Sequence, residues 1–117
     1  GKSITPHGDG SSSRDYTYID DCVHGVLGAI DKTARDPGYA VYNLGNSATT
    51  TLTELVTKIE AAVGKDAVIE RVGDQPGDVP RTFADISKAR ADLGYDPKTP
   101  VSEGVPKFVE WMKAKRA

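Results

Sequence analysis

A single arginine beside a flexible polar loop is the first group in this sequence that could bind a ligand. Arg14 follows the turn-forming residues 7–13, which include two glycines and three serines, and it begins an alternating run that predicts a strand. A guanidinium is planar and permanently charged, and its N–H groups match two oxygens of a phosphate. In such a strand, Tyr16 lies two positions on and therefore on the same face as Arg14. The alternative is a surface arginine that forms an ion pair with Asp9 or Asp15.

Metal and disulfide chemistry have little support in the sequence. His7 and His24 have no nearby cysteine, histidine or paired carboxylates at ligand-like spacing, so neither predicts a metal site or a general base. Cys22 is the only cysteine and therefore has no partner for an intrachain disulfide or a zinc site. We expect no bound metal.

The hydrophobic pattern predicts a mixed α/β chain with three to four short strands and four helices. Strands are expected from the β-favouring runs at 14–19, 39–44 and 67–72, with a further short piece at 2–5. Helices are expected at about 22–34, 51–64, 85–93 and from 102 onward.

Polar residues and glycines mark the expected helix ends. Asp21 and Asp85 stand where the N-caps of the first and third helices are expected. Thr51 and Glu54 fit the S/T-x-x-E capping box of the second helix. Glycines directly after the second and third helices are expected to end them.

Apolar residues at helical spacing predict the faces that form a core. The stripes are Val23, Val26, Leu27 and Ile30 in the first helix, Leu52, Leu55, Val56, Ile59 and Val63 in the second, and Val105, Phe108, Val109 and Met112 in the last. Gly25 and Gly28 each cost roughly 1 kcal/mol relative to alanine within a helix, so we expect a neighbouring element to approach closely there. Pro106 is tolerated only in the first turn, which places the start of the last helix no earlier than Ser102.

Length and charge narrow the classes of protein. The 117 residues are room for one domain, 1–117. The formal charge is −2 and no long run of like charge occurs, which disfavours a nucleic acid partner. No stretch approaches the roughly 20 apolar residues of a membrane span, and the first residues lack the apolar centre of a signal peptide. We expect a soluble, cytoplasmic protein with no membrane partner.

Three motifs, in the right order, resemble a known family. The run G-D-G-S-S-S-R-D-Y-T-Y-I-D-D at 8–21 resembles the segment that opens the C-terminal region of extended short-chain dehydrogenases/reductases, especially the UDP-glucuronate and UDP-glucose 4-epimerases. The run Y-N-L-G-N-S at 42–47 resembles the strand and turn before that family's next helix. The run Q-P-G-D-V-P-R-T-F-A-D at 75–85 resembles its nucleotide-contacting loop. With L-G-Y-D-P-K-T-P at 93–100 and the final helix, the likeness covers nearly the whole chain.

The resemblance implies a sugar-nucleotide site made of Arg14, Tyr16, Gln75 and Asp78. Arg14 matches the family arginine that reaches the phosphate and ribose side of the nucleotide. Asp78 matches the acidic position used toward the ribose hydroxyls, where a carboxylate can accept two hydrogen bonds; alternatively, it is a turn-forming residue. Gln75 stands where some relatives have arginine, so its contact is neutral at best. Arg81 either adds a cation to the site or pairs with a nearby aspartate.

The catalytic parts of this family are not found in residues 1–117. The family uses a glycine-rich turn between a strand and a helix for the NAD pyrophosphate, and a tyrosine four residues before a lysine as the acid/base pair. None of the five tyrosines has a lysine four residues later, and the nearest glycine pattern, Gly25 to Gly28, lies within an expected helix. No catalytic or cofactor-binding residue is predicted in the chain. NAD is expected only in a full-length parent, on an N-terminal Rossmann domain that this chain lacks.

The sequence therefore favours the UDP-sugar-binding portion of an NAD-dependent nucleotide-sugar 4-epimerase, not catalytic alone. In such an enzyme, the resemblance implies oxidation at sugar C4, rotation of the 4-keto intermediate and return of the hydride to the other face. One alternative is a freestanding binding module, in which the surface for the absent domain becomes a homo-oligomer interface. Another is the same portion of a sugar-nucleotide dehydratase or decarboxylase.

Overall fold

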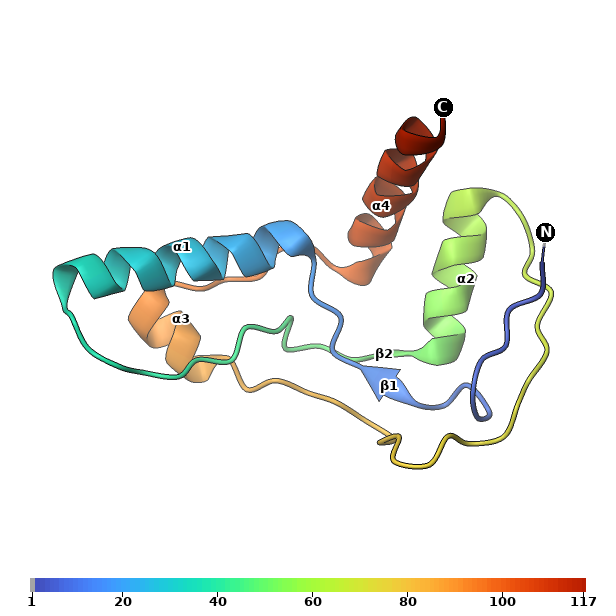
Figure 1. The fold of residues 1–117 in the computed structure, drawn as a ribbon, viewed down its shortest axis with the longest axis horizontal. Coiled ribbons are helices and arrows are strands. Elements are labelled where there is room, and N and C mark those ends of the chain that lie inside the picture. Colours follow the sequence, from blue (N-terminus) through green and yellow to red (C-terminus); the bar gives the residue numbers. More distant parts are fainter. Residues whose placement is uncertain (1) are drawn as a thin grey trace.

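The computed structural model describes residues 2–117 as four helices joined by long irregular segments (Figure 1). The helices are α1 (Ile19–Arg35), α2 (Leu52–Val63), α3 (Ser87–Leu93) and α4 (Val101–Arg116). The strands β1 (Ser13–Arg14) and β2 (Thr50–Thr51) pair antiparallel, with Ser13 opposite Thr51. The expected mixed α/β class and the four helices are confirmed.

The chain is flatter and more open than a compact domain of its length. One end of the molecule carries α1 and α3, the other carries α2 and α4, and extended segments run between them (Figure 1). The Cα radius of gyration is 17.1 Å and the extents are 51 × 38 × 18 Å. A compact domain of this length has a radius of gyration of about 13 Å. The chain by itself therefore leaves much apolar surface uncovered.

The strand predictions are largely wrong. The strand expected at 14–19 stops at Arg14, and residues 39–44 pair with no strand in the part of the chain that the structure describes. Residues 67–72 are joined to 4–7 only by isolated parallel bridges. The physical reason is that β-favouring residues become a strand only where another strand supplies the hydrogen bonds of a ladder.

The core is small and centres on the fully buried ring of Tyr95. Ile86 and Ala89 are buried with it. Gly25 of α1 lies against this core, since a Cβ at that position would come within 2.8 Å of both Leu44 methyl groups and 3.0 Å from the Tyr95 ring. The close approach expected from the glycines of α1 is thus confirmed.

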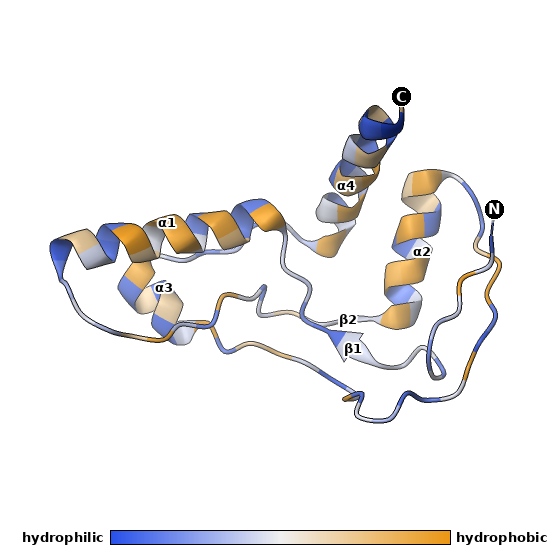
Figure 2. Ribbon diagram, viewed as in Figure 1, coloured by the Kyte–Doolittle hydropathy of each residue, from blue (hydrophilic) through white to orange (hydrophobic). Residues whose placement is uncertain are grey.

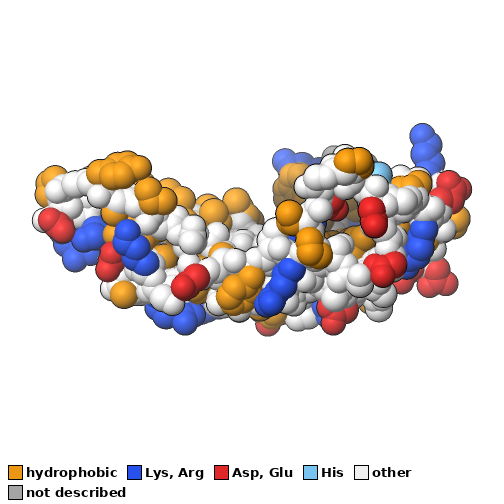
Figure 3. All heavy atoms as spheres, turned by 90° about the horizontal axis from the view of Figure 1, so that it is seen from below, with side chains coloured by type: hydrophobic (Ala, Val, Ile, Leu, Met, Phe, Trp, Pro, Cys, Tyr) orange, Lys and Arg blue, Asp and Glu red, His pale blue; other side chains and the backbone are white. Residues whose placement is uncertain are grey.

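The apolar stripe of α1 does not face the core, contrary to the prediction. We call these four residues the α1 stripe: Val23, Val26, Leu27 and Ile30. All four are between 46% and 61% exposed. The buried residues of α1 are Asp21 and Gly25. The helix packs on the core at Gly25, because the absence of a side chain there lets Leu44 and Tyr95 approach closely. Figure 2 shows the hydrophobic colouring along α1, and Figure 3 shows hydrophobic side chains gathered along one edge at that end of the molecule.

Asp21 is not the N-cap of α1, which begins three residues earlier than expected. The cap position is Tyr18, whose side chain makes no capping hydrogen bond. The buried carboxylate of Asp21 instead accepts hydrogen bonds from the backbone N–H groups of Lys98 and Thr99, each at 3.0 Å. Asp21 thus ties α1 to the segment before α4, which a single-helix pattern cannot indicate.

The ends of α2 follow its sequence signals. Thr51 and Glu54 form the complete capping box, and Gly64 ends the helix in the left-handed conformation at φ 77°. The capping box and the C-terminal glycine each depend only on residues within one helical turn of each other. The expected core stripe of α2 is only partly covered, since no residue of the helix is buried.

The predictions for α3 and α4 are confirmed in part. α3 begins at Ser87 and its N-cap position is Ile86, so the prediction of Asp85 as the N-cap is wrong. The carboxylate of Asp85 nevertheless accepts the N–H of Ser87 at 2.9 Å. α4 begins at Val101, one residue earlier than expected. Val109 is buried as predicted, whereas Phe108 is 59% exposed. Within residues 2–117, α2 is the helix that packs closely against α4, and Phe108 stays open to solvent.

Burial of Tyr95 makes folding sensitive to high pH. Its hydroxyl donates to the carbonyl oxygen of Gly45 at 2.6 Å, and burial raises the pKa of the phenol from 10.0 to about 12. The folded state therefore holds this proton more tightly than the unfolded state. The stabilisation is complete below about pH 10 and is lost as the pH rises toward about 12.

We expect this titration to be visible in urea unfolding between about pH 9 and about pH 12. Relative to a Tyr95→Phe variant, the free energy of unfolding should decline by up to about 1.4 kcal/mol per pH unit above about pH 10. Equal slopes for the two proteins would contradict the assignment to Tyr95.

Candidate functional site

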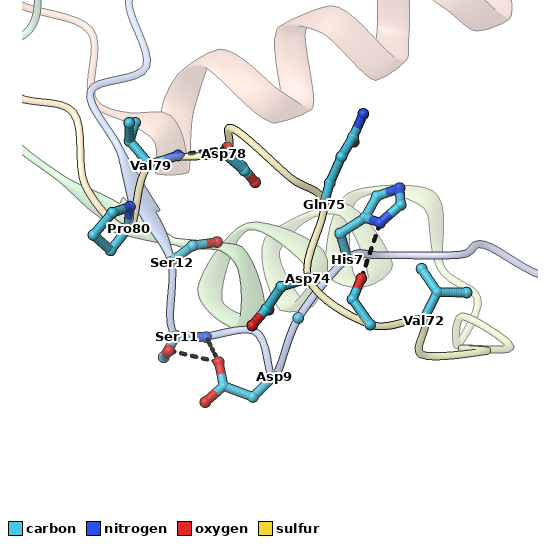
Figure 4. Close-up of a pocket in the computed structure, with 12 residues that line it drawn as sticks. His7, Asp9, Ser11, Ser12, Val72, Asp74, Gln75, Asp78, Val79 and Pro80 are labelled. Carbon is cyan, nitrogen blue, oxygen red and sulfur yellow. Dashed lines mark hydrogen bonds between the residues drawn. The ribbon is translucent and has the colours of Figure 1, made fainter.

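Two segments run side by side and then part to form a cavity. Residues 4–8 pair with 68–72 through backbone hydrogen bonds of 2.9–3.2 Å, and Ser13 pairs with 80–82 at 2.9 and 3.1 Å. Between these paired ends the two segments separate and leave a cavity of about 690 Å³ (Figure 4). We call this cavity the polar hollow.

Several hydrogen-bonding side chains line the polar hollow, together with apolar ones. Three carboxylates, an amide and an imidazole line it: Asp9, Asp74, Asp78, Gln75 and His7 (Figure 4). The pKa of Asp9 lies below its ordinary value of 3.8, because the hydroxyl and the backbone N–H of Ser11 donate to its carboxylate. Carboxylates accept hydrogen bonds but do not donate them, so the hollow suits a ligand rich in hydroxyl groups.

Arg14 and Asp78, which are 64 residues apart, meet at the edge of the polar hollow. Nη2 of Arg14 donates to Oδ1 of Asp78 at 2.5 Å, and Nη1 donates to the carbonyl oxygen of Ser13 at 2.8 Å. Their side chains are 26% and 49% exposed, so both charges are open to solvent. No ion pair within residues 2–117 joins Arg14 to Asp9 or Asp15, the alternative partners.

Gln75 lines the polar hollow with Asp78, but Tyr16 lies elsewhere. Because β1 ends at Arg14, the strand from which a shared face of Arg14 and Tyr16 was predicted does not extend to Tyr16. Tyr16 lines a separate apolar groove of about 330 Å³ between α2 and α4. Its role in binding stays a prediction.

Within the described residues, Arg81 does not form the ion pair with Asp78 or Asp85 that was one alternative for it. Its guanidinium lies over the ring of Phe83, 5.2 Å from the centroid, in a cation–π contact. Arg81 does not line the polar hollow, and no ion pair within residues 2–117 joins it to Asp78 or Asp85. Arg14 is the cation that contacts the carboxylate of Asp78. We call residues 74–78, which carry Asp74 and Asp78, the acidic loop.

Asp15 is the residue near the site that the sequence did not reveal. Its carboxylate accepts hydrogen bonds from three backbone N–H groups, those of Asn46 at 2.8 Å, Ser47 at 3.1 Å and Ala84 at 3.1 Å. The sequence indicates Asp15 only as an ion-pair partner for its neighbour Arg14. Its donors lie 31 to 69 residues away, so no local pattern predicts them.

Other site types receive no support from residues 2–117. Within that range, no group of three or more histidine, cysteine, aspartate or glutamate side chains could hold a metal ion. The Nδ1 atom of His7 lies 3.2 Å from the carbonyl oxygen of Gly73. None of the described helices has the length and apolar character needed to cross a membrane.

The chain is similar to a dehydratase family and to proteins that include a probable UDP-glucuronate 4-epimerase. A sequence model of the family described as GDP-mannose 4,6 dehydratase matches residues 1–108. A probable UDP-glucuronate 4-epimerase of Rhizobium meliloti is 36% identical over 127 residues, which cover 95% of this chain and 37% of that protein. An uncharacterised protein of Methanocaldococcus jannaschii is 42% identical over 112 residues, which cover 96% of this chain and 33% of that protein.

A solved structure agrees with these sequence likenesses. The UDP-glucuronic acid 4-epimerase of Bacillus cereus, in complex with UDP-glucuronic acid and NAD, matches with a TM-score of 0.88 at 33% identity, over 97% of this chain and 36% of that one. The chain thus spans about a third of the length of the relatives it matches. These likenesses confirm the resemblance to epimerases of the extended short-chain dehydrogenase/reductase type.

Proposed function

The chain belongs to the GDP-mannose 4,6 dehydratase family, and on that premise we propose that it is the UDP-sugar-binding portion of an NAD-dependent nucleotide-sugar 4-epimerase. The observation that carries the proposal is the contact between Arg14 and Asp78 at the edge of the polar hollow. A guanidinium suits the diphosphate, and a carboxylate can accept hydrogen bonds from the ribose hydroxyls. The UDP-glucuronic acid held by the Bacillus cereus relative supports this substrate class.

The ion pair of Arg14 and Asp78 can break so that each side chain binds a nucleotide instead. Both side chains are partly exposed, and an exposed ion pair contributes only about 0–1 kcal/mol, so breaking it costs little. A diphosphate can then accept hydrogen bonds from Arg14, and the freed carboxylate of Asp78 can accept them from hydroxyl groups. Gln75, beside Asp78, adds a neutral hydrogen-bonding group.

The named relatives favour a 4-epimerase over a dehydratase or decarboxylase. The family description names a dehydratase, but the relatives from Rhizobium meliloti and Bacillus cereus are named as UDP-glucuronate 4-epimerases. The loop sequence from Gln75 to Asp78 also resembles the epimerases more closely. A dehydratase or decarboxylase is the second candidate, because both would bind the nucleotide through the same portion.

We infer that the pyrophosphate of NAD is held outside residues 2–117. A dinucleotide pyrophosphate is held at a helix N-terminus that follows a strand through a glycine-rich turn. Among the helices of residues 2–117, α2 directly follows the strand β2, but no glycine lies between the two. We therefore assign NAD and the catalytic acid/base pair to a separate Rossmann domain. We call this chain together with that domain the parent enzyme, and we infer that the chain is not catalytic alone.

The α1 stripe is the surface that we assign to contact with the Rossmann domain. It is an exposed apolar face on a chain whose radius of gyration exceeds that of a compact domain, and such faces mark interaction sites. A homo-oligomer that covers the stripe is the alternative. Sedimentation equilibrium of the 117-residue chain separates the two, since a homo-oligomer would persist without the Rossmann domain.

Titration of UDP into the parent enzyme tests the proposed site. Arg14→Ala should weaken UDP binding at least about tenfold, because a hydrogen bond to a charged group contributes about 1.5–3 kcal/mol. Arg35→Ala is the matched control, since Arg35 also pairs with an aspartate, Asp31 at 2.9 Å, but within α1. We expect the control to change the dissociation constant less than about twofold by isothermal titration calorimetry.

Three outcomes would count against the proposal at different levels. Equal UDP affinities for the wild type and Arg14→Ala would overturn the assigned contact, and a wild type that binds no UDP would overturn the function. A complete reading frame without a glycine-rich strand-to-helix turn and a Tyr-x-x-x-Lys pair would favour a freestanding module instead.

A further inference from the structure

The carboxylate of Asp15 joins three segments that are distant in sequence. Oδ1 accepts the N–H of Asn46, and Oδ2 accepts the N–H groups of Ser47 and Ala84. Its own backbone follows Arg14 at the end of β1. Because the donors belong to the backbone and the carboxylate can only accept, these bonds hold the three segments in one arrangement.

Ala84 stands at the end of a short ladder that begins beside the polar hollow. Ser13 donates its N–H to Pro80 and accepts the N–H of Thr82, at 2.9 and 3.1 Å. The N–H of Asp15 then donates to Oγ1 of Thr82 at 3.2 Å, and the carboxylate of Asp15 accepts a hydrogen bond from the N–H of Ala84. These four hydrogen bonds keep the acidic loop in one register relative to β1.

The space around the Asp15 carboxylate is tight. A Cβ added to Gly45 would lie 2.8 Å from Oδ2 of Asp15 and would also collide with the Cβ of Ala84. No cationic side chain within residues 2–117 forms an ion pair with Asp15. The carboxylate of Asp15 accepts its hydrogen bonds from backbone N–H groups. Its effect is therefore to fix the positions of these segments relative to one another.

From this arrangement we infer that Asp15 is a positioning residue for the nucleotide site, because it sets the register that brings Asp78 against Arg14. Asp78 precedes the ladder by two residues, so a shift of the ladder moves its carboxylate relative to the guanidinium. Asp15 itself does not contact the nucleotide. The inference rests on the proposed function, which assigns the nucleotide to Arg14 and Asp78.

Asp15→Asn in the parent enzyme tests this role, since it keeps the size of the side chain and replaces one acceptor oxygen with a donor. The dissociation constant for UDP should rise about tenfold, as expected when one charge-assisted contact is lost. The KM for the UDP-sugar should rise in parallel, while kcat stays within about twofold, because the binding portion alone is disturbed.

Asp21→Asn is the matched control. The carboxylate of Asp21 also accepts two backbone N–H groups, those of Lys98 and Thr99, but it does not line the polar hollow. Both variants should lower the melting temperature. Only Asp15→Asn should weaken UDP binding, whereas Asp21→Asn should leave the dissociation constant within about twofold.

Equal UDP affinities for the two asparagine variants would overturn the inference. The proposed function would stand in that case if the wild type binds UDP and Arg14→Ala binds it at least about tenfold more weakly, whereas a wild type without UDP binding would overturn both. If Asp15→Asn does not fold, Thr82→Val removes the hydroxyl that accepts the Asp15 N–H. A rise of about threefold in the UDP dissociation constant then supports the inference, and an unchanged constant overturns it.

Discussion

Replacing Tyr95 with alanine should lower the free energy of unfolding of the chain by about 3–5 kcal/mol. The side chain is 0% exposed, its ring packs with Ile86 and Ala89, and its hydroxyl donates to the carbonyl oxygen of Gly45. Truncation removes the buried ring, leaves a cavity and deprives the carbonyl of its donor. No other large side chain in residues 2–117 is as fully buried, so the rest of this small core has little capacity to compensate.

Tyr39→Ala is the matched control for this prediction. Tyr39 is 93% exposed, so the same truncation should change the free energy of unfolding by no more than about 0.5 kcal/mol. Urea unfolding followed by circular dichroism measures both variants. Similar losses at the two positions would show that Tyr95 is not the centre of the core.

Replacing Leu27 with aspartate should separate the chain's own stability from its proposed contact with the Rossmann domain. Leu27 is 57% exposed within the α1 stripe, so the 117-residue chain should change by no more than about 0.5 kcal/mol. In the parent enzyme, the new carboxylate would be buried without a partner. We expect a loss of about 3 kcal/mol or more there, measured by urea unfolding.

The control for this second prediction is Val68→Asp. Val68 is 61% exposed but lies outside α1, and the change should leave both proteins within about 0.5 kcal/mol of their wild types. If Leu27→Asp weakens the chain and the parent enzyme equally, the α1 stripe is part of the chain's own core. If it weakens neither, the stripe does not contact the Rossmann domain.

Sequence reasoning worked best where neighbouring residues decide the structure. The capping box of Thr51 and Glu54 set the start of α2, and Gly64 set its end, because each interaction closes within one helical turn. The motif likeness also named Arg14 and Asp78, which the fold brings into contact. The placement of Tyr16 beside Arg14 depended on a strand that continues past Arg14. In residues 2–117 the sheet consists of β1 and β2 only, and β1 ends at Arg14, so that strand does not form.

The sequence by itself determined the family and the four helices, since these follow from local patterns and motifs, and it also supplied the charged residues that we propose contact a nucleotide. Only the tertiary structure decided that Asp15, Asp21 and Tyr95 tie the chain together, because their hydrogen-bond partners lie 31 to 78 residues away. The tertiary structure also decided that the α1 stripe faces solvent. Periodicity predicts that a helix has an apolar face, but the surface that covers that face depends on what packs against it.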